Sequence, residues 1–114
     1  MSDEIDPNAR PSGDGCEECL ARDTWWFHLR RCAACGHVGC CDSSPGRHAT
    51  GHFRETGHPI MQSFEPGEEW FFDFRDGQVG RGPELTAPTS HPQSQPTPAP
   101  ADRVPADWRE HLHP

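Results

Sequence analysis

Short hydrophobic runs separated by turn-forming residues predict a small sheet in the middle of the chain. These runs, rich in aromatic or β-branched residues, are 25–31, 37–40, 60–64 and 70–74. A turn at 65–67 joins the last two runs, and Asp76-Gly77 predicts a closing turn after them. The pattern therefore predicts short strands connected by tight turns.

One main helix is predicted between the second and third of these strands. Ser44 is a candidate N-cap, and Pro45 suits the first helical position, where its missing N–H costs no hydrogen bond. The helix then covers 47–56 and ends at Gly57, a residue that readily adopts the left-handed conformation of a helix end. Together these elements predict the α+β class, with a short twisted antiparallel sheet.

Polar segments flank this region. Residues 1–15 show no hydrophobic periodicity, and residues 81–103 are dominated by Pro, Ser, Thr and Ala. Such compositions bury too little apolar surface to offset the entropy of chain ordering, so we expect a disordered lead and a Pro-rich linker. In the tail, 104–114, Trp108 and Leu112 are spaced to share one face of a short helix. The tail either frays or folds back onto the domain, and the sequence leaves both open.

The remaining domain, residues 16–80, has 65 residues and needs more than a hydrophobic core. A core of this size rarely supplies more than about 3–5 kcal/mol. Zinc binding supplies about 10–16 kcal/mol of folding free energy when the metal-free chain is unfolded. The cysteines and histidines of this domain are therefore the first candidates for a stabilising device.

Eight potential zinc ligands occur in the domain at ordered spacings. They are Cys16, Cys19, Cys32, Cys35, Cys40, His48, His52 and His58. Eight ligands fill two tetrahedral sites, which is typical of structural zinc and leaves no position for an activated water. Each Cys-x2-Cys pair can chelate one ion, and His48 and His52 share a face of the predicted helix. Spacing alone does not decide which of the other ligands completes which site.

Two other uses of these residues fit the sequence less well. Six cysteines can form three disulfides in a secreted protein, but residues 1–10 lack the basic and apolar regions of a signal peptide, and disulfides give no role to the histidines. The pair His48 and His52 also has the spacing of a zinc protease, but Ala49 occupies the position of the general-base Glu. We therefore expect a protein that is not an enzyme.

Charge and hydrophobicity exclude other classes of partner. The formal net charge is -8, and all 10 basic residues are Arg. A phosphate backbone would be repelled, so we expect no nucleic-acid binding. No apolar run approaches the roughly 18 residues that span a bilayer, so we expect no membrane association. The lack of a signal peptide predicts a cytoplasmic location.

The ligand pattern, Trp26 and the run Glu55-Thr56-Gly57-His58-Pro59 closely resemble the UBP-type zinc finger family, found in ubiquitin-specific proteases and a cytoplasmic histone deacetylase. The similarity covers about residues 16–75. It implies two interleaved zinc sites, one formed by Cys16, Cys19, Cys40 and His48 and the other by Cys32, Cys35, His52 and His58. Some members bind a further zinc through cysteines near the last strand, but 70–74 contains none, so we expect two structural zinc ions.

Members of this family typically bind the free C-terminal tail of ubiquitin in a deep aromatic pocket. The resemblance implies that Trp26, Trp70 and Phe72 form its walls in this chain. Flat aromatic walls can close on a glycine tail, which has no side chains, while hydrogen-bond donors capture the terminal carboxylate.

The chain departs from the family at those donors. Ubiquitin-binding members usually have Gly-Arg after the ligand that corresponds to Cys40, whereas this chain has Cys41 and Asp42. One pocket aromatic is often Tyr, and this chain contains no Tyr. We expect Arg47, at the start of the helix, to supply the missing donor.

These observations predict a zinc-binding, non-catalytic module that recognises an extended peptide or a free C-terminal tail. The ligand is the tail of another protein, or this chain's own Trp108 segment docked as a plug. The competing hypothesis is a thiol-based redox or zinc-release sensor. In that hypothesis Cys32, Cys35 and Cys40 lose metal on oxidation, and Cys41 resolves the oxidised thiol.

Overall fold

The structure is a computed structural model that describes residues 4–111 of the 114-residue chain. Its elements are α1 (Glu17–Ala21), β1 (Leu29–Cys32), β2 (Val38–Cys40), α2 (His48–Thr56), β3 (Ile60–Ser63), β4 (Phe71–Asp73), β5 (Gln78–Gly80) and the 3-10 helix η1 (Trp108–His111). Helices and an antiparallel sheet confirm the predicted α+β class. None of the described helices has the length and apolar character needed to cross a membrane.

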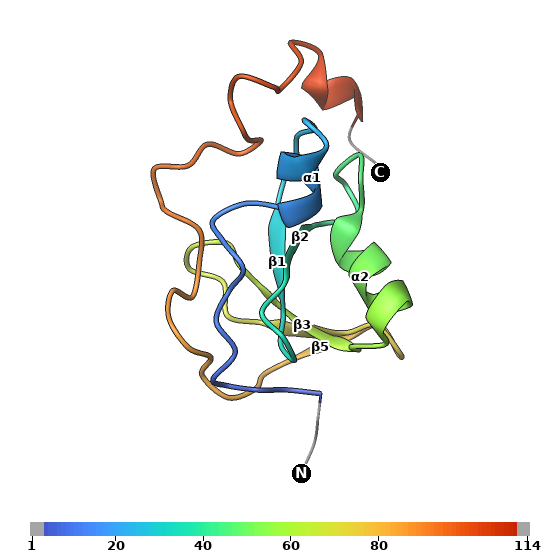
Figure 1. Cartoon of the computed structure of the whole chain (residues 1–114), viewed down its shortest axis with the longest axis vertical. Helices are drawn as coiled ribbons and strands as arrows, with labels where there is room; N and C mark the ends of the chain where they lie inside the picture. The colour runs from blue at the N-terminus through green and yellow to red at the C-terminus, as the bar shows by residue number, and fades with distance from the viewer. Residues whose placement is uncertain (1–3, 112–114) are drawn as a thin grey trace.

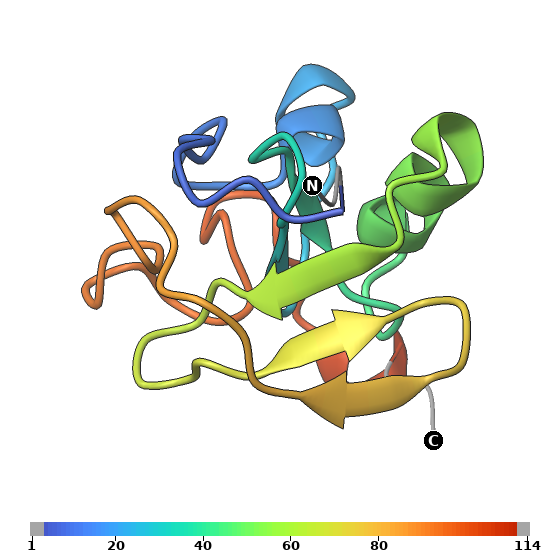
Figure 2. The ribbon, with the colours of Figure 1, turned by 90° about the horizontal axis from the view of Figure 1, so that it is seen from below.

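One antiparallel sheet contains all the strands of the described chain, in the order β2-β1-β3-β4-β5. Seen from below, β3, β4 and β5 lie side by side while β1 and β2 rise behind them, so the sheet is strongly twisted (Figure 2). Both α-helices contact β2, with α1 near one end of β1 and β2 and α2 along one side (Figure 1). Residues from α1, β2 and α2 can therefore meet at one point.

The predicted strands at 37–40, 60–64 and 70–74 correspond to β2, β3 and β4, but α1 and β5 were not predicted. The residues of β5 are exposed, so a hydrophobic pattern could not reveal this strand. β1 begins only at Leu29, because Trp26 pairs instead with Ala99 in an isolated bridge. Pairing with a distant part of the chain thus set the boundary of this strand.

The start of α2 differs from its prediction, and its end agrees. α2 begins at His48, and Arg47 before it has left-handed backbone (φ 49°) and makes no side-chain capping bond. Ser44, the predicted N-cap, is buried, and its hydroxyl accepts a hydrogen bond from the Phe27 N–H at 2.9 Å. The Ser44 hydroxyl therefore bonds the buried N–H of Phe27 and does not cap the helix. Gly57 ends the helix with φ 78°, as predicted.

Two clusters of buried residues form the core. The larger consists of Cys16, Cys19, Trp26, Leu29, Val38, Cys40, Phe64 and Ala99. The smaller consists of Ala33, Phe71 and Leu85, with Ile5 and Ile60 packed against it. Both clusters include residues from outside 16–80, so the core is not confined to the predicted domain.

The lead, residues 4–15, and the strap, residues 81–111, lie along the same side of the sheet (Figure 1). The fully buried guanidinium of Arg31 donates to the carbonyl of Ala9 at 2.6 Å and to that of Pro88 at 3.1 Å. Their composition predicts disorder, yet in the structure both segments contact the domain. A few buried apolar residues and hydrogen bonds from the sheet hold these two segments against the domain, although their average composition predicts disorder.

The end of the strap folds back onto the domain. Ala99 and Trp26 exchange two backbone hydrogen bonds, of 2.8 and 2.9 Å. The ring of Trp108, in η1, lies 5.6 Å from the ring of Phe27 between centroids. Of the two alternatives for the tail, the structure thus has the docked one for its described residues. Leu112, proposed as the partner of Trp108 on one helix face, lies outside those residues.

Candidate metal centres and binding groove

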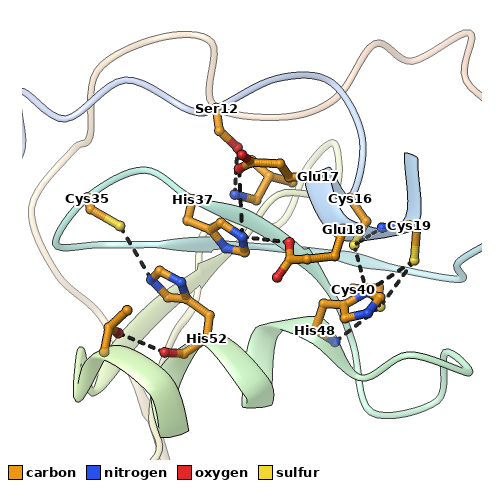
Figure 3. Close-up of polar contacts among 12 residues, drawn as sticks. Ser12, Cys16, Glu17, Glu18, Cys19, Cys35, His37, Cys40, His48 and His52 are labelled. Carbon is orange, nitrogen blue, oxygen red and sulfur yellow. Dashed lines mark hydrogen bonds and ion pairs between the residues drawn. The ribbon is translucent and has the colours of Figure 1, made fainter. Parts of the chain in front are cut away.

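One group of ligands forms what we call the buried centre: Cys16, Cys19, Cys40 and His48 bring their ligand atoms within 4.8 Å of one another (Figure 3). Cys16 caps α1, Cys19 lies in α1, Cys40 ends β2 and His48 begins α2. Nδ1 of His48 lies 3.2, 3.3 and 3.5 Å from the sulfurs of Cys16, Cys19 and Cys40 respectively. The three sulfur ligands have no exposed surface, and His48 is 9% exposed.

The second group, which we call the open centre, contains Cys32, Cys35, His52 and His58, again with ligand atoms within 4.8 Å. Sγ of Cys32 lies 3.5 Å from Nδ1 of His58, and Sγ of Cys35 lies 3.4 Å from Nε2 of His52. Cys35 is exposed and both histidines are partly so. Solvent therefore reaches the open centre more readily than the buried one.

Both groups fit zinc by donor type and by spacing. Tetrahedral zinc, with Zn–S of about 2.3 Å and Zn–N of about 2.0–2.1 Å, places neighbouring ligand atoms about 3.3–3.8 Å apart. Six ligand pairs in the two groups are 3.2 to 3.8 Å apart, and all ligand atoms of each group lie within 4.8 Å of one another. Each group supplies four ligands, so each can close one tetrahedral site. The grouping is the interleaved one that the resemblance implies.

Protonation equilibria differ between the ligands. The thiol of Cys16 is hydrogen-bonded to Cys19, which raises the pKa of Cys16 and lowers the pKa of Cys19 to about 3. Burial, followed by the charges of His37 and His58, lowers the pKa of His52 to about 4. Neutral imidazole and thiolate are the forms that bind zinc, so the lowered pKa values of Cys19 and His52 favour zinc binding.

A groove of about 510 Å³ lies between β1, the start of α2 and the strands β3 to β5. Met61, Trp70, Phe72 and Phe74 give it an apolar, largely aromatic wall. The rings of Phe72 and Phe74 meet edge to face, with centroids 5.2 Å apart. The groove is open to solvent, as a site for an extended chain must be.

The rest of the lining, which we call the polar side, is largely polar or charged. It includes His28, Arg30, Cys41 and Asp42. The guanidinium carbon of Arg30 lies 4.7 Å from the ring centroid of Trp70, a cation–π arrangement. Asp42 accepts a hydrogen bond from the hydroxyl of Thr50, at 2.6 Å, which ties this carboxylate to α2. Cationic donors and an aromatic wall thus face the same groove.

The thiol of Cys41 belongs to neither metal group and lies in the wall of this groove. Burial raises its pKa, but hydrogen bonds from His28, from Ser44 and from the backbone outweigh burial and bring the pKa to about 7. The same contact with Cys41 raises the pKa of His28. The two side chains therefore stabilise a thiolate–imidazolium pair at the polar side of the groove.

The family model of the zinc finger in ubiquitin hydrolases and other proteins matches residues 16–81. The chain belongs to this zinc-finger family. The finger is also similar to the solution NMR structure of protein RPA1320 from Rhodopseudomonas palustris, with a TM-score of 0.66 and 43% identity, covering 76% of this chain and 87% of that one. The comparison with curated proteins gave no match.

Of the predicted pocket residues of the finger, Trp70 and Phe72 line the groove and Trp26 and Arg47 do not. Trp26 is 2% exposed, because the strap pairs with its backbone and its side chain joins the larger core cluster. Arg47 precedes α2 in a left-handed conformation and is not part of the groove lining. The structure therefore places neither Trp26 nor Arg47 in this groove, whose wall is supplied by β3, β4 and their flanks.

Arg30 and His28 are among the groove residues of the finger that sequence reasoning missed. Side chains alternate between the two faces of a strand, so Arg30 and Arg31 in β1 point in opposite directions. Arg31 is buried against the lead and the strap, which leaves Arg30 on the groove side. The doublet itself was visible in the sequence, but which Arg faces the groove depends on what covers the other face.

Proposed function

We propose that the finger is a non-catalytic module that binds an extended peptide with a free C-terminal carboxylate in the groove. The position of Arg30 carries this proposal, because its guanidinium lies over Trp70 where the aromatic wall meets the polar side. A guanidinium offers paired N–H donors to a carboxylate, and this charge-assisted bond is roughly twice as strong as a neutral one. Arg30 takes the role that the sequence analysis gave to Arg47.

The ligand of the groove is the tail of another protein in this proposal. Flat aromatic side chains such as Trp70 and Phe72 suit a tail of glycine or other small residues, whose backbone they can cover. Trp108, the candidate plug from this chain, packs on Phe27 and is not among the groove-lining residues. Peptides that end in Gly-Gly are therefore the first to test.

Zinc has a structural role in this proposal and takes no part in chemistry. When bound, two ions would hold α1, α2 and the sheet together, one at each centre. Three groove-lining residues directly follow ligands of the buried centre in the sequence: Cys41 and Asp42 follow Cys40, and Ala49 follows His48. Four protein ligands per centre leave no position for an activated water, which supports a binding role over an enzymatic one.

Paired peptides test the proposal. The zinc-loaded chain is titrated with a Gly-Gly-ending peptide that carries a free carboxylate and with its C-terminal amide, monitoring Trp fluorescence and amide NMR shifts. We expect the free acid to bind at least tenfold more tightly, with shifts at Trp70 and Arg30. Arg30→Gln should abolish the difference, whereas Arg54→Gln on the exposed face of α2 should preserve it. Equal binding of acid and amide contradicts carboxylate recognition, and no binding of either contradicts the peptide site.

One observation favours the second candidate, a zinc-release sensor: Cys35, a ligand of the open centre, is exposed. In this mechanism peroxide takes two electrons from the thiolates of Cys32 and Cys35, which form a disulfide while peroxide and two protons become two waters. The open centre then loses its zinc. The Cys41 thiol contacts Ser44 and His28, so the resolving role proposed for it has no support from these contacts. Native mass spectrometry after mild peroxide separates the candidates, since a peptide binder retains both zinc ions and a sensor loses one.

A further inference from the structure

We propose that His37 couples the two metal centres, so that filling the buried centre raises the affinity of the open centre for zinc. His37 belongs to neither ligand group, yet its side chain lies between them (Figure 3). The proposal concerns metal loading alone and is independent of the peptide site.

His37 is connected to the buried centre through its contact with Glu18. Its Nε2 lies 2.7 Å from a carboxylate oxygen of Glu18 and 3.7 Å from one of Glu17. A carboxylate only accepts, so Nε2 of His37 carries the hydrogen and donates it to Glu18. Glu18 lies in α1 between two ligands of the buried centre, Cys16 and Cys19.

His37 is connected to the open centre through its contact with His52. The rings of His37 and His52 are stacked, with centroids 4.1 Å apart and planes 2° apart. His37 also follows Cys35, another ligand of the open centre, by two positions in the sequence. A ring held face to face cannot rotate freely, so His37 limits the orientations open to His52. Contacts that orient a ligating histidine typically change metal affinity by about 10–100-fold.

The position of Glu18 in α1 determines that the buried centre influences the open one. α1 has only five residues, and a helix that short is marginal in water without a further constraint. Its N-cap is the sulfur of Cys16, which accepts the N–H of Cys19 at 3.5 Å. Filling the buried centre therefore fixes α1 and with it Glu18. A fixed Glu18 holds His37, and His37 then presents a flat face to His52 before the open centre is filled.

Cadmium-113 NMR of the full chain tests the coupling, because three sulfurs and one nitrogen in the buried centre, and two of each in the open centre, give separate resonances. Cadmium is added stepwise to the metal-free protein with a competing chelator, which yields a first and a second binding constant. In the wild type we expect the buried-centre resonance first. In His37→Ala the first constant should stay within about twofold, while the second should fall by about 10-fold or more.

Glu18→Ala is the second variant, since it removes the hydrogen bond to His37 and keeps every ligand. It should weaken the second constant alone, whereas Glu17→Ala, which removes the more distant carboxylate of the same helix turn, should change neither. An unchanged second constant in both His37→Ala and Glu18→Ala overturns the proposal. Equal losses in both constants overturn it as well, because they indicate general destabilisation. A third cadmium resonance lost in Glu17→Ala would also overturn it, because Glu17, Glu18 and His37 would then bind metal themselves.

Discussion

Nε2 of His91 lies 3.0 Å from a carboxylate oxygen of Glu65, and both side chains are buried. The same oxygen of Glu65 also accepts the backbone N–H of Leu29 at 3.0 Å. His91 belongs to the strap, whereas Glu65 follows β3 and Leu29 begins β1. One buried carboxylate therefore joins the strap to the centre of the sheet.

Replacing His91 by Ala should destabilise the zinc-loaded protein, because the carboxylate of Glu65 stays buried and loses a partner. The expected loss in the free energy of unfolding is about 1–3 kcal/mol. Urea denaturation of the zinc-loaded chain measures it. Gln93→Ala, an exposed change in the same segment, is the matched control and should be neutral. Equal stability of the two variants would show that the strap does not contribute through this contact.

Replacing Arg31 by Met should loosen the lead and the strap together. Two bonds from a charged donor are lost, to the carbonyls of Ala9 and Pro88, and such bonds contribute about 1.5–3 kcal/mol each. Hydrogen exchange should therefore become roughly tenfold faster or more at the amide of Thr86, which bonds the lead. Arg30→Met, the neighbouring change on the groove side, should leave this exchange rate unaltered. Unchanged exchange in Arg31→Met would contradict the anchoring role.

Acid should destabilise the fold and release zinc from the open centre. The pKa of His52 is lowered from 6.5 to about 4 in the folded chain, so the unfolded chain binds more protons between these values. Stability therefore rises with pH across this window, and it falls as the pH is lowered from about 6.5 towards 4. Protonation of a ligand also opposes metal binding. Zinc release measured by a colorimetric chelator should increase as the pH is lowered from 7 to 4, and release that is flat over this range would contradict the argument.

Adjacent cysteines should respond in opposite ways to the same substitution. Cys40→Ser removes a ligand of the buried centre, and zinc contributes about 10–16 kcal/mol to folds of this kind, as much as a whole domain's usual stability. We expect this variant to lose a zinc and its near-ultraviolet circular dichroism. Cys41→Ser removes a thiol that belongs to neither group, so it should retain two zinc ions and the fold. Removing zinc from the wild type with a chelator should reproduce the first result; a folded metal-free chain would contradict the role given to the metal.

Local sequence signals predicted the helix end and three strands well, because they depend on neighbouring residues. Gly57 provides the left-handed end of α2, and the runs at 37–40, 60–64 and 70–74 contain β2, β3 and β4. The start of α2 was predicted at Ser44 and not at His48, since the hydroxyl of Ser44 bonds a residue distant in sequence. Local propensity cannot anticipate such a partner.

The eight ligands are determined by the sequence alone, because the spacing of thiols and imidazoles is enough to identify zinc ligands. Their division into two interleaved groups, by contrast, depends on tertiary structure. β2 and α2 bring Cys40 next to His48, and α2 places His52 next to the second Cys-x2-Cys pair. The groove depends on tertiary structure for the same reason. Whether Trp26 or Arg30 lines the groove is decided by the strap, which buries Trp26 and Arg31 and leaves Arg30 beside Trp70. The sequence determined the chemistry available to this protein, and long-range packing decided which of its side chains meet.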